Sequence, residues 1–465
     1  MWDQIMPGQE ENFEKHNESD ALNVSYDYTS VMHYDKTAFS NGSLPTMIAK
    51  DQKFTNIMGQ HLDLSEQDIL KLNKLYRSNS SLTFLDQCSF EPDRICDIIQ
   101  GAGDNADWQL VTQAPGEPLS DHTYLGSNFS GHFMHFSTAT GSAGDKAYLE
   151  SKTFHPKRSF QCLQFFSYHS GSADDQLNVW IREYDMTHPN GSLRLMGSIT
   201  GSPGDCWQLH HIHLNATKPF RVIFEGRKGT GSSSGGLSID DVNLSETQCP
   251  AHTWHIRNFT QLLETTKPKY IFSPRFQSSE GYTFQISVSV NGTSFPGFMT
   301  VFFHLTSGEN DDRLQWPCAW RQGTMVLMDQ NPDIRKQMSN QRSTMTDPVT
   351  PAPDGSSQLF WDDPRKVGSL VTDENGTSYY RGPGDEFSLF LSHNRLRSRE
   401  FMKGDDVFFL LTMEDASHLR SSQTLSMNTQ PSTTFETTTQ HSTSSPGMAA
   451  SSLLFTVAFL AALLQ

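Results

Sequence analysis

Apolar and polar residues alternate along several short stretches of this chain, and the alternation predicts β-strands. In residues 220–225, Phe220, Val222 and Phe224 fall on one face, a period of two that is typical of a half-buried antiparallel strand. Residues 282–290 repeat the pattern, with five apolar residues alternating with four polar ones. Because turns rich in glycine and serine separate such stretches, we expect most of the chain to be β-sheet.

A different period near the amino-terminal end predicts a helix. The apolar residues Ile69, Leu72 and Leu75 recur at helical spacing after Ser65, and Tyr76 continues the series. Ser65 and Asp68 have the spacing of a capping box, in which each side chain accepts a hydrogen bond from the backbone amide of the other residue. We therefore expect a helix that begins just after Ser65.

Length, charge and glycosylation motifs narrow the class of protein. The chain has 465 residues, which is room for roughly three domains, and its formal net charge of −17 with no basic block argues against a nucleic-acid partner. Eleven Asn-x-Ser/Thr motifs favour a glycosylated extracellular protein. The candidate glycosylation sites are Asn17, Asn23, Asn41, Asn79, Asn128, Asn190, Asn215, Asn243, Asn258, Asn291 and Asn375.

One group of residue types could bind a metal. Cys206 is close in sequence to three histidines, and two of them would project from the same strand face. A strand over 207–214 whose histidines face solvent explains the pattern without a metal, and we favour it because a fourth spaced ligand is missing. The residues concerned are Cys206, His210, His211 and His213.

A pair of adjacent acidic residues has two interpretations as well. We expect Asp240 and Asp241 to lie at the end of a strand and to accept backbone hydrogen bonds. The alternative is an ion-binding role, since carboxylates are the usual ligands of hard cations.

Residues 86–249 resemble a MAM domain, an adhesion module of cell-surface proteins. The resemblance rests on the opening residues 88–91, on residues 103–108, and on residues 236–242 before the last cysteine. It implies an extracellular β-sandwich with two disulfides. The implied pairs are Cys88–Cys96 and Cys162–Cys249, and Cys206 and Cys318 have no disulfide partner in this scheme.

Residues 1–78 resemble the C-terminal, α+β part of an astacin-family zinc metallopeptidase domain. The run from Ser30 to Tyr34 matches the family's Met-turn, and the helix predicted after Ser65 matches the helix that ends the domain. The resemblance implies that Met32 would form a hydrophobic base beneath the zinc. It also implies that Tyr34 would be a displaceable zinc ligand that later stabilises the oxyanion.

The zinc-binding helix of that family has no counterpart in this sequence. Astacins bind zinc through His-Glu-x-x-His-x-x-Gly-x-x-His, whose glutamate activates the metal-bound water. The sequence contains no His-Glu dipeptide, so we expect the chain to begin just past its own active site, with only Met32 and Tyr34 left of the catalytic set. Zinc is the cofactor of the family. We expect none to be bound by this chain as written, because one tyrosine oxygen cannot replace three strong ligands.

Residues 250–414 resemble a MATH (TRAF-like) β-sandwich. The resemblance is carried by residues 253–259, 314–318, 359–361 and 401–411. The order astacin, MAM, MATH is that of the meprins, a subfamily of the astacins. The expected fold class is therefore mainly β, with two sandwiches after the peptidase segment.

The last part of the chain predicts a membrane attachment. Residues 415–447 are rich in serine and threonine and poor in apolar residues, which is typical of a disordered, O-glycosylated stalk. Residues 448–465 are apolar, and we favour a glycolipid-anchor signal with Ser442 as the candidate attachment residue. A spanning helix is the alternative, although the apolar run is short and no lysine or arginine follows it.

Three functional hypotheses follow from these patterns. The first is a meprin-like metalloendopeptidase ectodomain at the cell surface that is inactive as written. The second is a fragment of an active zinc metalloendopeptidase whose upstream sequence restores the site. The third is an adhesion protein that acts through its MAM and MATH domains. Peptide or protein substrates, assembly into oligomers through these domains and attachment to a membrane are the expected interactions.

Overall fold

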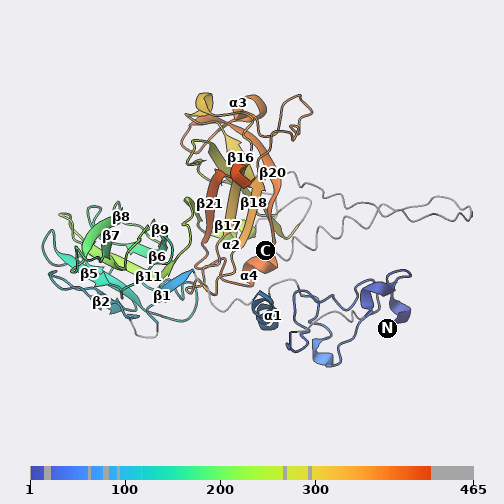
Figure 1. Ribbon diagram of the computed structural model, residues 1–465, viewed down its shortest axis with the longest axis horizontal. Coiled ribbons are helices and arrows are strands. Elements are labelled where there is room, and N and C mark those ends of the chain that lie inside the picture. Colours follow the sequence, from blue (N-terminus) through green and yellow to red (C-terminus); the bar gives the residue numbers. More distant parts are fainter. Residues whose placement is uncertain are drawn as a thin grey trace, which may run out of the picture.

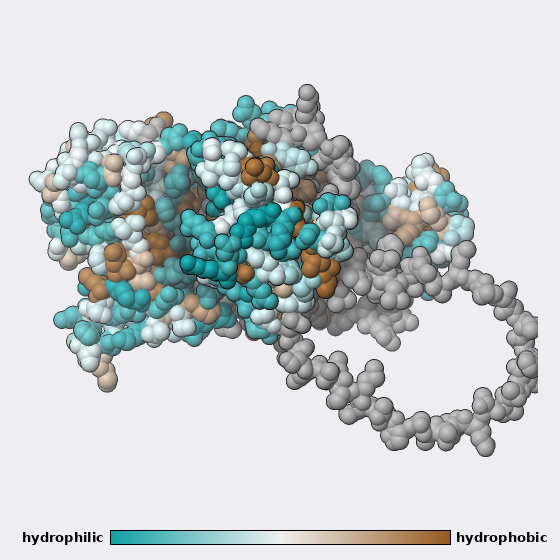
Figure 2. All heavy atoms as spheres, turned by 90° about the horizontal axis from the view of Figure 1, so that it is seen from above, coloured by the Kyte–Doolittle hydropathy of each residue, from teal (hydrophilic) through white to brown (hydrophobic). Residues whose placement is uncertain are grey.

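The fold has three parts, and it is mainly β, as the sequence predicts (Figure 1). The computed structural model describes residues 2–14, 22–60, 64–76, 83–91, 95–116, 118–264, 270–291 and 296–419. The apolar tail, Ser442, Asn17 and Asn79 lie outside these residues, as does the predicted stalk beyond residue 419. Figure 2 shows a surface that is largely hydrophilic, with hydrophobic residues in small patches.

The amino-terminal segment is mostly loop, and it ends in the predicted helix. The helix α1 spans Glu66–Tyr76, after three short 3-10 helices at η1 (Trp2–Gln4), η2 (Glu10–Phe13) and η3 (Gln52–Phe54). The capping box is confirmed: the amide of Asp68 donates to Ser65 Oγ at 3.0 Å, and the amide of Ser65 donates to Asp68 Oδ2 at 3.0 Å. Asp68 is also the buried residue of the first turn, whereas Ile69 is exposed.

The MAM-like part is a sandwich of two antiparallel sheets. One sheet has the order β3-β4-β11-β6-β9 with β1 beside β11, and the other has the order β2-β5-β10-β7-β8. The first sheet consists of β1 (Phe84–Cys88), β3 (Gln109–Val111), β4 (Phe133–Ser137), β6 (Cys162–His169), β9 (Gln208–His213) and β11 (Gly236–Ser245). The second consists of β2 (Ile99–Gln100), β5 (Lys146–Glu150), β7 (Gln176–Glu183), β8 (Ser192–Ile199) and β10 (Phe220–Arg227).

The strand β10 departs from the expected half-buried pattern. Phe220, Val222 and Phe224 do enter the core between the two sheets, as the alternation predicts. Ile223 and Glu225 on the other face are also buried, each with 3 % of its surface exposed. The buried carboxylate of Glu225 accepts hydrogen bonds from Trp180 Nε1 at 2.7 Å and Asn178 Nδ2 at 3.1 Å. It also forms an ion pair with Lys146 Nζ at 3.3 Å. The prediction of a half-buried strand was wrong because side chains of the neighbouring strands cover the outer face.

The MATH-like part is a second sandwich. Its smaller sheet has the order β12-β21-β17-β18, and its larger sheet has the order β13-β15-β16-β20-β19 with β14 beside β15. The smaller sheet consists of β12 (His252–Ile256), β17 (Arg321–Leu327), β18 (Asn340–Met345) and β21 (Val407–Asp415). The larger consists of β13 (Tyr270–Phe272), β14 (Phe276–Gln277), β15 (Thr283–Ser289), β16 (Phe298–Thr306), β19 (Ser369–Thr372) and β20 (Ser378–Ser392). Short helices α2 (Phe259–Leu263), α3 (Pro364–Val367) and α4 (His393–Arg397), and the 3-10 turns η4 (Asp311–Arg313) and η5 (Ser417–Leu419), complete it.

A buried polar network covers the outer face of β15. Every residue of this strand is buried, although four of its positions are polar. Ser287 Oγ donates to His304 Nε2 at 2.9 Å, and His304 Nδ1 donates to the carbonyl of Gly382 at 3.1 Å. This direction is that of the neutral imidazole, which is favoured because burial lowers the pKa of His304 to about 4.

The two sandwiches share a third hydrophobic core where they meet. It combines Phe166 and Trp207 of the MAM-like part with Met328 and Phe408 of the MATH-like part, and all four are buried. Phe166 and Phe408 contact edge to face, with ring centroids 5.7 Å apart. Successive side chains of β21 point to opposite faces, so Phe408 lies in this shared core and Phe409 lies in the MATH-like core. We call this contact between the sandwiches the junction.

Replacing the aromatic ring at the junction should uncouple the sandwiches. We predict that Phe408→Ala lowers the free energy of unfolding by about 3 kcal/mol and splits one calorimetric transition into two, because the lost ring belongs to both parts. Phe409→Ala is the matched control. It removes an equally buried ring from the MATH-like core alone and should lower the midpoint without separating the transitions. A single transition in the Phe408→Ala protein would contradict the shared core.

Acid should destabilise the MATH-like part through His304. Its pKa falls from 6.5 to about 4 on folding, so the unfolded state binds more protons between these values. The neutral, buried His304 contributes to the free energy of unfolding above pH 6.5. This contribution, about 3 kcal/mol, is lost as the pH falls toward 4. Urea unfolding across this range should show a shallower pH dependence for His304→Gln than for the wild type. The exposed His213→Gln control should match the wild type, and equal slopes for all three proteins would contradict the assignment.

Candidate functional site

The Met-turn is held in place by the capping residue of α1. Ser30 Oγ donates to Asp68 Oδ1 at 2.6 Å, and the backbone amide of Val31 donates to Asp68 Oδ2 at 3.1 Å. One carboxylate thus closes the helix and fixes the turn before Met32. Met32 and Tyr34 are 53 % and 41 % exposed, so in this structure Met32 does not form the buried base that the resemblance implies.

The residues present around the Met-turn do not fit a zinc ion. Both ring nitrogens of His33 are engaged: Nδ1 donates to the carbonyl of Tyr34 at 2.6 Å, and Nε2 accepts from the hydroxyl of Tyr26 at 2.6 Å. Tyr34 lies edge to face with Phe39, with centroids 5.5 Å apart. A hollow of 630 Å³ nearby is lined mainly by aromatic and aliphatic side chains such as Trp2 and Tyr28. The described part of this segment therefore lacks three free donors for zinc.

The junction contains a buried asparagine that belongs to both sandwiches. Asn243 lies on β11 and has 1 % of its surface exposed. Its Nδ2 donates to the carbonyls of Asp241 at 3.1 Å and Pro332 at 2.9 Å, and its Oδ1 accepts from the amide of Ile334 at 3.0 Å. The expectation of a glycan at Asn243 is incompatible with this fold, because the nitrogen that would carry the sugar is enclosed and donates two hydrogen bonds.

The other described candidate glycosylation sites are more exposed than Asn243. Asn291 is half-buried, and its Oδ1 accepts from the amide of Gly297 at 2.9 Å. Seven side chains are exposed, so their glycosylation stays a prediction: Asn23, Asn41, Asn128, Asn190, Asn215, Asn258 and Asn375.

Two glycines bring the backbones of the sandwiches close together. A Cβ added to Gly126 would lie 3.1 Å from the Cα of Gly404, and one added to Gly404 would lie 2.5 Å from Leu125 Cδ2. Both glycines have positive φ, at 80° and 57°. A groove of 460 Å³ runs beside this approach, lined by Glu91 and Tyr124 on one side and by charged residues of the MATH-like part on the other, namely Lys336, Arg399 and Lys403.

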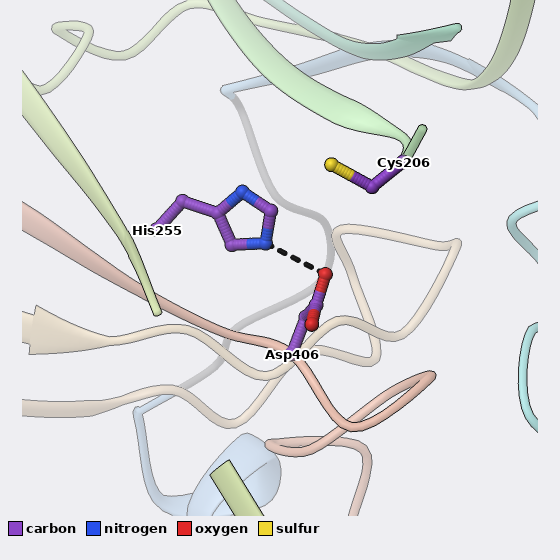
Figure 3. Close-up of side chains that lie close together, drawn as sticks. All are labelled: Cys206, His255 and Asp406. Atoms are coloured by element: carbon purple, nitrogen blue, oxygen red, sulfur yellow. Dashed lines mark hydrogen bonds and ion pairs between the residues drawn. The ribbon is translucent and has the colours of Figure 1, made fainter. Parts of the chain in front are cut away.

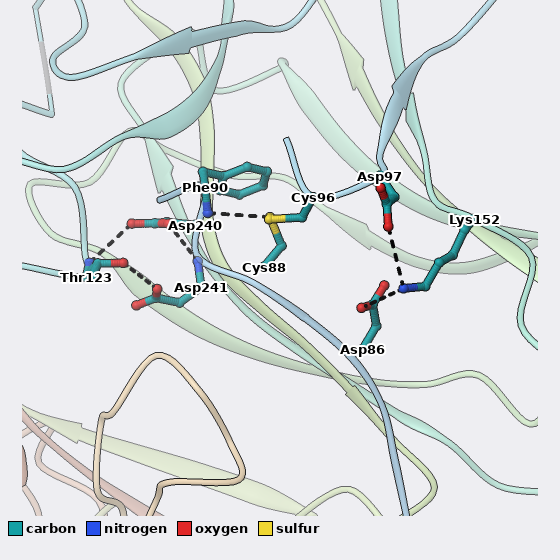
Figure 4. Close-up of a disulfide and its surroundings, with 9 residues drawn as sticks. All are labelled: Asp86, Cys88, Phe90, Cys96, Asp97, Thr123, Lys152, Asp240 and Asp241. Atoms are coloured by element: carbon teal, nitrogen blue, oxygen red, sulfur yellow. Dashed lines mark hydrogen bonds and ion pairs between the residues drawn. A yellow bond between two sulfur atoms is a disulfide. The ribbon is translucent and has the colours of Figure 1, made fainter. Parts of the chain in front are cut away.

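The acidic pair is part of a buried network rather than a strand end. Asp240 and Asp241 lie inside β11 at an irregularity of its pairing, where Asp241 has a φ of 47°. Asp240 accepts from the amide of His122 at 2.7 Å, which confirms its expected role toward the backbone. Asp241 accepts from Thr123 Oγ1 and pairs with His122 Nδ1, both at 2.6 Å. Figure 4 shows the two carboxylates beside Thr123. Burial, and then the charge of Asp241, raise the pKa of Asp240.

The structure contains both disulfides that the MAM resemblance implies. Cys88–Cys96 closes the loop at the start of the first sheet (Figure 4), and Cys162–Cys249 ties β6 to the end of the sandwich. Cys206 and Cys318 are free thiols. Burial raises the pKa of Cys318 to about 12, so it behaves as a core residue rather than a nucleophile.

The candidate cluster of Cys206 with three histidines does not form among the described residues. His210 Nε2 and Ser167 Oγ are 2.8 Å apart, and His211 Nε2 and Gln164 Oε1 are 3.2 Å apart. Burial lowers the pKa of these histidines to about 4 and about 3 respectively, and only His213 is exposed. The favoured alternative, in which the histidines face solvent, was therefore wrong for His210 and His211.

Cys206 lies instead beside two residues of the MATH-like part. The ligand atoms of Cys206, His255 and Asp406 all lie within 4.8 Å of one another, and His255 Nε2 is 2.7 Å from Asp406 Oδ2 (Figure 3). Sequence reasoning missed His255 and Asp406, because nothing in the local pattern around either residue points to the other. Their proximity to Cys206 exists only because the sandwiches dock.

Comparison with known proteins accounts for all three parts. The model of the astacin peptidase family matches residues 1–77, that of the MAM domain (meprin/A5/mu) matches 88–250, and that of the MATH domain matches 251–413. The human protein Meprin A subunit beta is 54 % identical over 91 % of this chain, and the match covers 60 % of that protein. The chain is similar to the meprins across all three parts. It spans about three fifths of the length of this relative.

Other relatives match at lower identity or over a smaller share of the chain. Meprin A subunit alpha of Rattus norvegicus is 39 % identical over 91 % of the chain and 57 % of that protein. The human MAM domain-containing glycosylphosphatidylinositol anchor protein 1 is 32 % identical over 35 % of the chain and 17 % of that protein. Among solved structures, the match to Notothenia coriiceps TRAF5 covers 35 % of this chain and 72 % of that protein, at 18 % identity and a TM-score of 0.27.

Asn243 should stabilise the junction and carry no glycan. In protein secreted from mammalian cells, we predict that glycopeptide mass spectrometry finds Asn243 unmodified and the exposed Asn190 modified. Asn243→Ala should lower the free energy of unfolding by about 2–3 kcal/mol, because it leaves buried partners without their hydrogen bonds. Asn190→Ala is the control and should change stability little. A glycan on Asn243 in folded protein would contradict the buried placement.

Proposed function

We propose that this chain is the non-catalytic ectodomain portion of a meprin-like metalloendopeptidase at the cell surface, inactive as written. The observation that carries the proposal is the donor set of the Met-turn segment. His33 uses both ring nitrogens in local hydrogen bonds, and Tyr34 offers one phenolic oxygen. Three strong ligands and a general base are needed to bind zinc and activate water.

The remaining parts supply surfaces rather than chemistry. MAM and MATH domains are interaction domains, and here they are joined by a shared apolar core and by the Asn243 bonds. Such a joined pair can present a fixed arrangement of surfaces to a substrate or to another subunit. This supports a role in docking and assembly within the meprin-like protein.

Placement at the cell surface is part of the same proposal. Two disulfides and exposed glycosylation motifs favour an oxidising, extracellular compartment. Within the described residues, the helices are all too short or too polar to span a bilayer. The glycolipid anchor proposed at Ser442 concerns residues beyond that region.

The chain as written should not cleave peptides. We predict no turnover of quenched fluorescent peptide libraries by the secreted chain, with or without added zinc, because the general base and the zinc ligands of the family are missing. Human Meprin A subunit beta, assayed in parallel, is the positive control. Cleavage that a chelator and Tyr34→Phe both abolish would contradict the proposal and favour an active site built from these residues.

A further inference from the structure

Three side chains of the junction have the chemistry of a metal site. Cys206 comes from the loop between β8 and β9, His255 from β12, and Asp406 from the residue before β21. Their sulfur, nitrogen and oxygen atoms lie within 4.8 Å of one another, and they are the one group of three such ligands found among the described residues. Figure 3 shows the sulfur of Cys206 and the carboxylate of Asp406 directed toward the imidazole of His255.

The mixture of donors selects the kind of ion. A thiolate, an imidazole and a carboxylate are ligands that zinc accepts together, whereas calcium and magnesium prefer oxygen alone. In a tetrahedral zinc site with bonds of about 2.0–2.3 Å, neighbouring ligand atoms lie about 3.3–3.7 Å apart. The present separations, from 2.7 Å to at most 4.8 Å, bracket that value. Small side-chain rotations that open the His255–Asp406 hydrogen bond would suffice.

The surroundings hold the ligands in place. The ring of His255 stacks on Phe408, with centroids 4.3 Å apart, and Gln330 Nε2 donates to the carbonyl of Asp406 at 2.9 Å. His255 and Asp406 are 16 % and 14 % exposed at the side chain, and Cys206 is half-buried, which leaves room for water as a fourth ligand. Such fixed neighbours orient metal ligands and are part of most protein metal sites.

The local charge is compatible with a dication. The thiolate and the carboxylate would supply two negative charges against the two positive charges of zinc. Arg257, whose charge acts on Cys206, is paired with Asp205 through contacts of 2.8 Å and 3.3 Å. Gln208 Nε2 donates to Cys206 Sγ at 2.9 Å, a bond that a thiolate would strengthen.

We propose that Cys206, His255 and Asp406 form a zinc-binding site that ties the MAM-like sandwich to the MATH-like sandwich. The site uses no residue of the astacin-like segment. It therefore differs from the catalytic zinc site of the family, whose ligands this chain lacks. Because the ligands come from both sandwiches, zinc binding stabilises their docked arrangement and is lost when they separate.

Metal titration of the secreted chain tests this site. The protein is stripped with a chelator and titrated with Zn²⁺ alone, and bound metal is counted by mass spectrometry. We expect one zinc per chain. Cys206→Ser and His255→Gln should each weaken binding at least 100-fold, and Co²⁺ should give a thiolate charge-transfer band that Cys206→Ser removes. Circular dichroism checks that each variant is folded.

Two controls separate this site from its alternatives. His213→Gln removes an exposed histidine of the candidate cluster around Cys206, and Tyr34→Phe removes the family's tyrosine ligand. Both should keep full zinc binding. No bound zinc in the wild type, or binding that survives Cys206→Ser, would overturn the proposal. Zinc lost in Tyr34→Phe would place the metal in the astacin-like segment instead and would overturn it too.

Discussion

The docking of the MAM-like and MATH-like sandwiches is the constraint on which the other features depend. Phe166 and Phe408 meet in an apolar core that neither sandwich could complete alone. Large aromatic rings left in water at this place would be unfavourable, so the contact is favoured by the hydrophobic effect. The groove, the buried amide of Asn243 and the proposed zinc ligands all lie along this contact.

Polar groups at the junction give the docking its orientation. Apolar contacts alone would allow the two sandwiches to shift relative to each other. A buried amide is hydrogen-bonded only in one relative orientation of the sandwiches, so it favours that orientation. Asn243 has hydrogen-bond partners in both sandwiches. Within the MAM-like part, His122 is fixed in a similar way: it pairs with Asp241, and its ring stacks on Phe166 with centroids 3.4 Å apart. A network thus extends from the acidic pair of β11 to the aromatic contact.

Local patterns predicted the elements, and resemblance predicted their arrangement within each part. The capping box of Ser65 and Asp68 and both disulfides appear as expected, and the strand containing Phe220 forms but is buried on both faces. Contacts between residues far apart in the chain could not be predicted in this way. Cys206 and Asp406 are two hundred positions apart, and the motif at Asn243 reads as a glycosylation site until its burial is known. Periodicity likewise cannot tell that neighbouring strands cover the polar face of β15.

A distance measurement between the sandwiches tests the central claim most directly. Spin labels can be carried by noncanonical amino acids at Met186 and Leu370, which are 100 % and 62 % exposed and lie in different sandwiches. Pulsed electron resonance on the secreted chain then reports the distribution of distances between them. A rigid junction predicts one narrow peak at the distance fixed by this structure. A broad distribution would mean that the sandwiches move independently and would contradict the account.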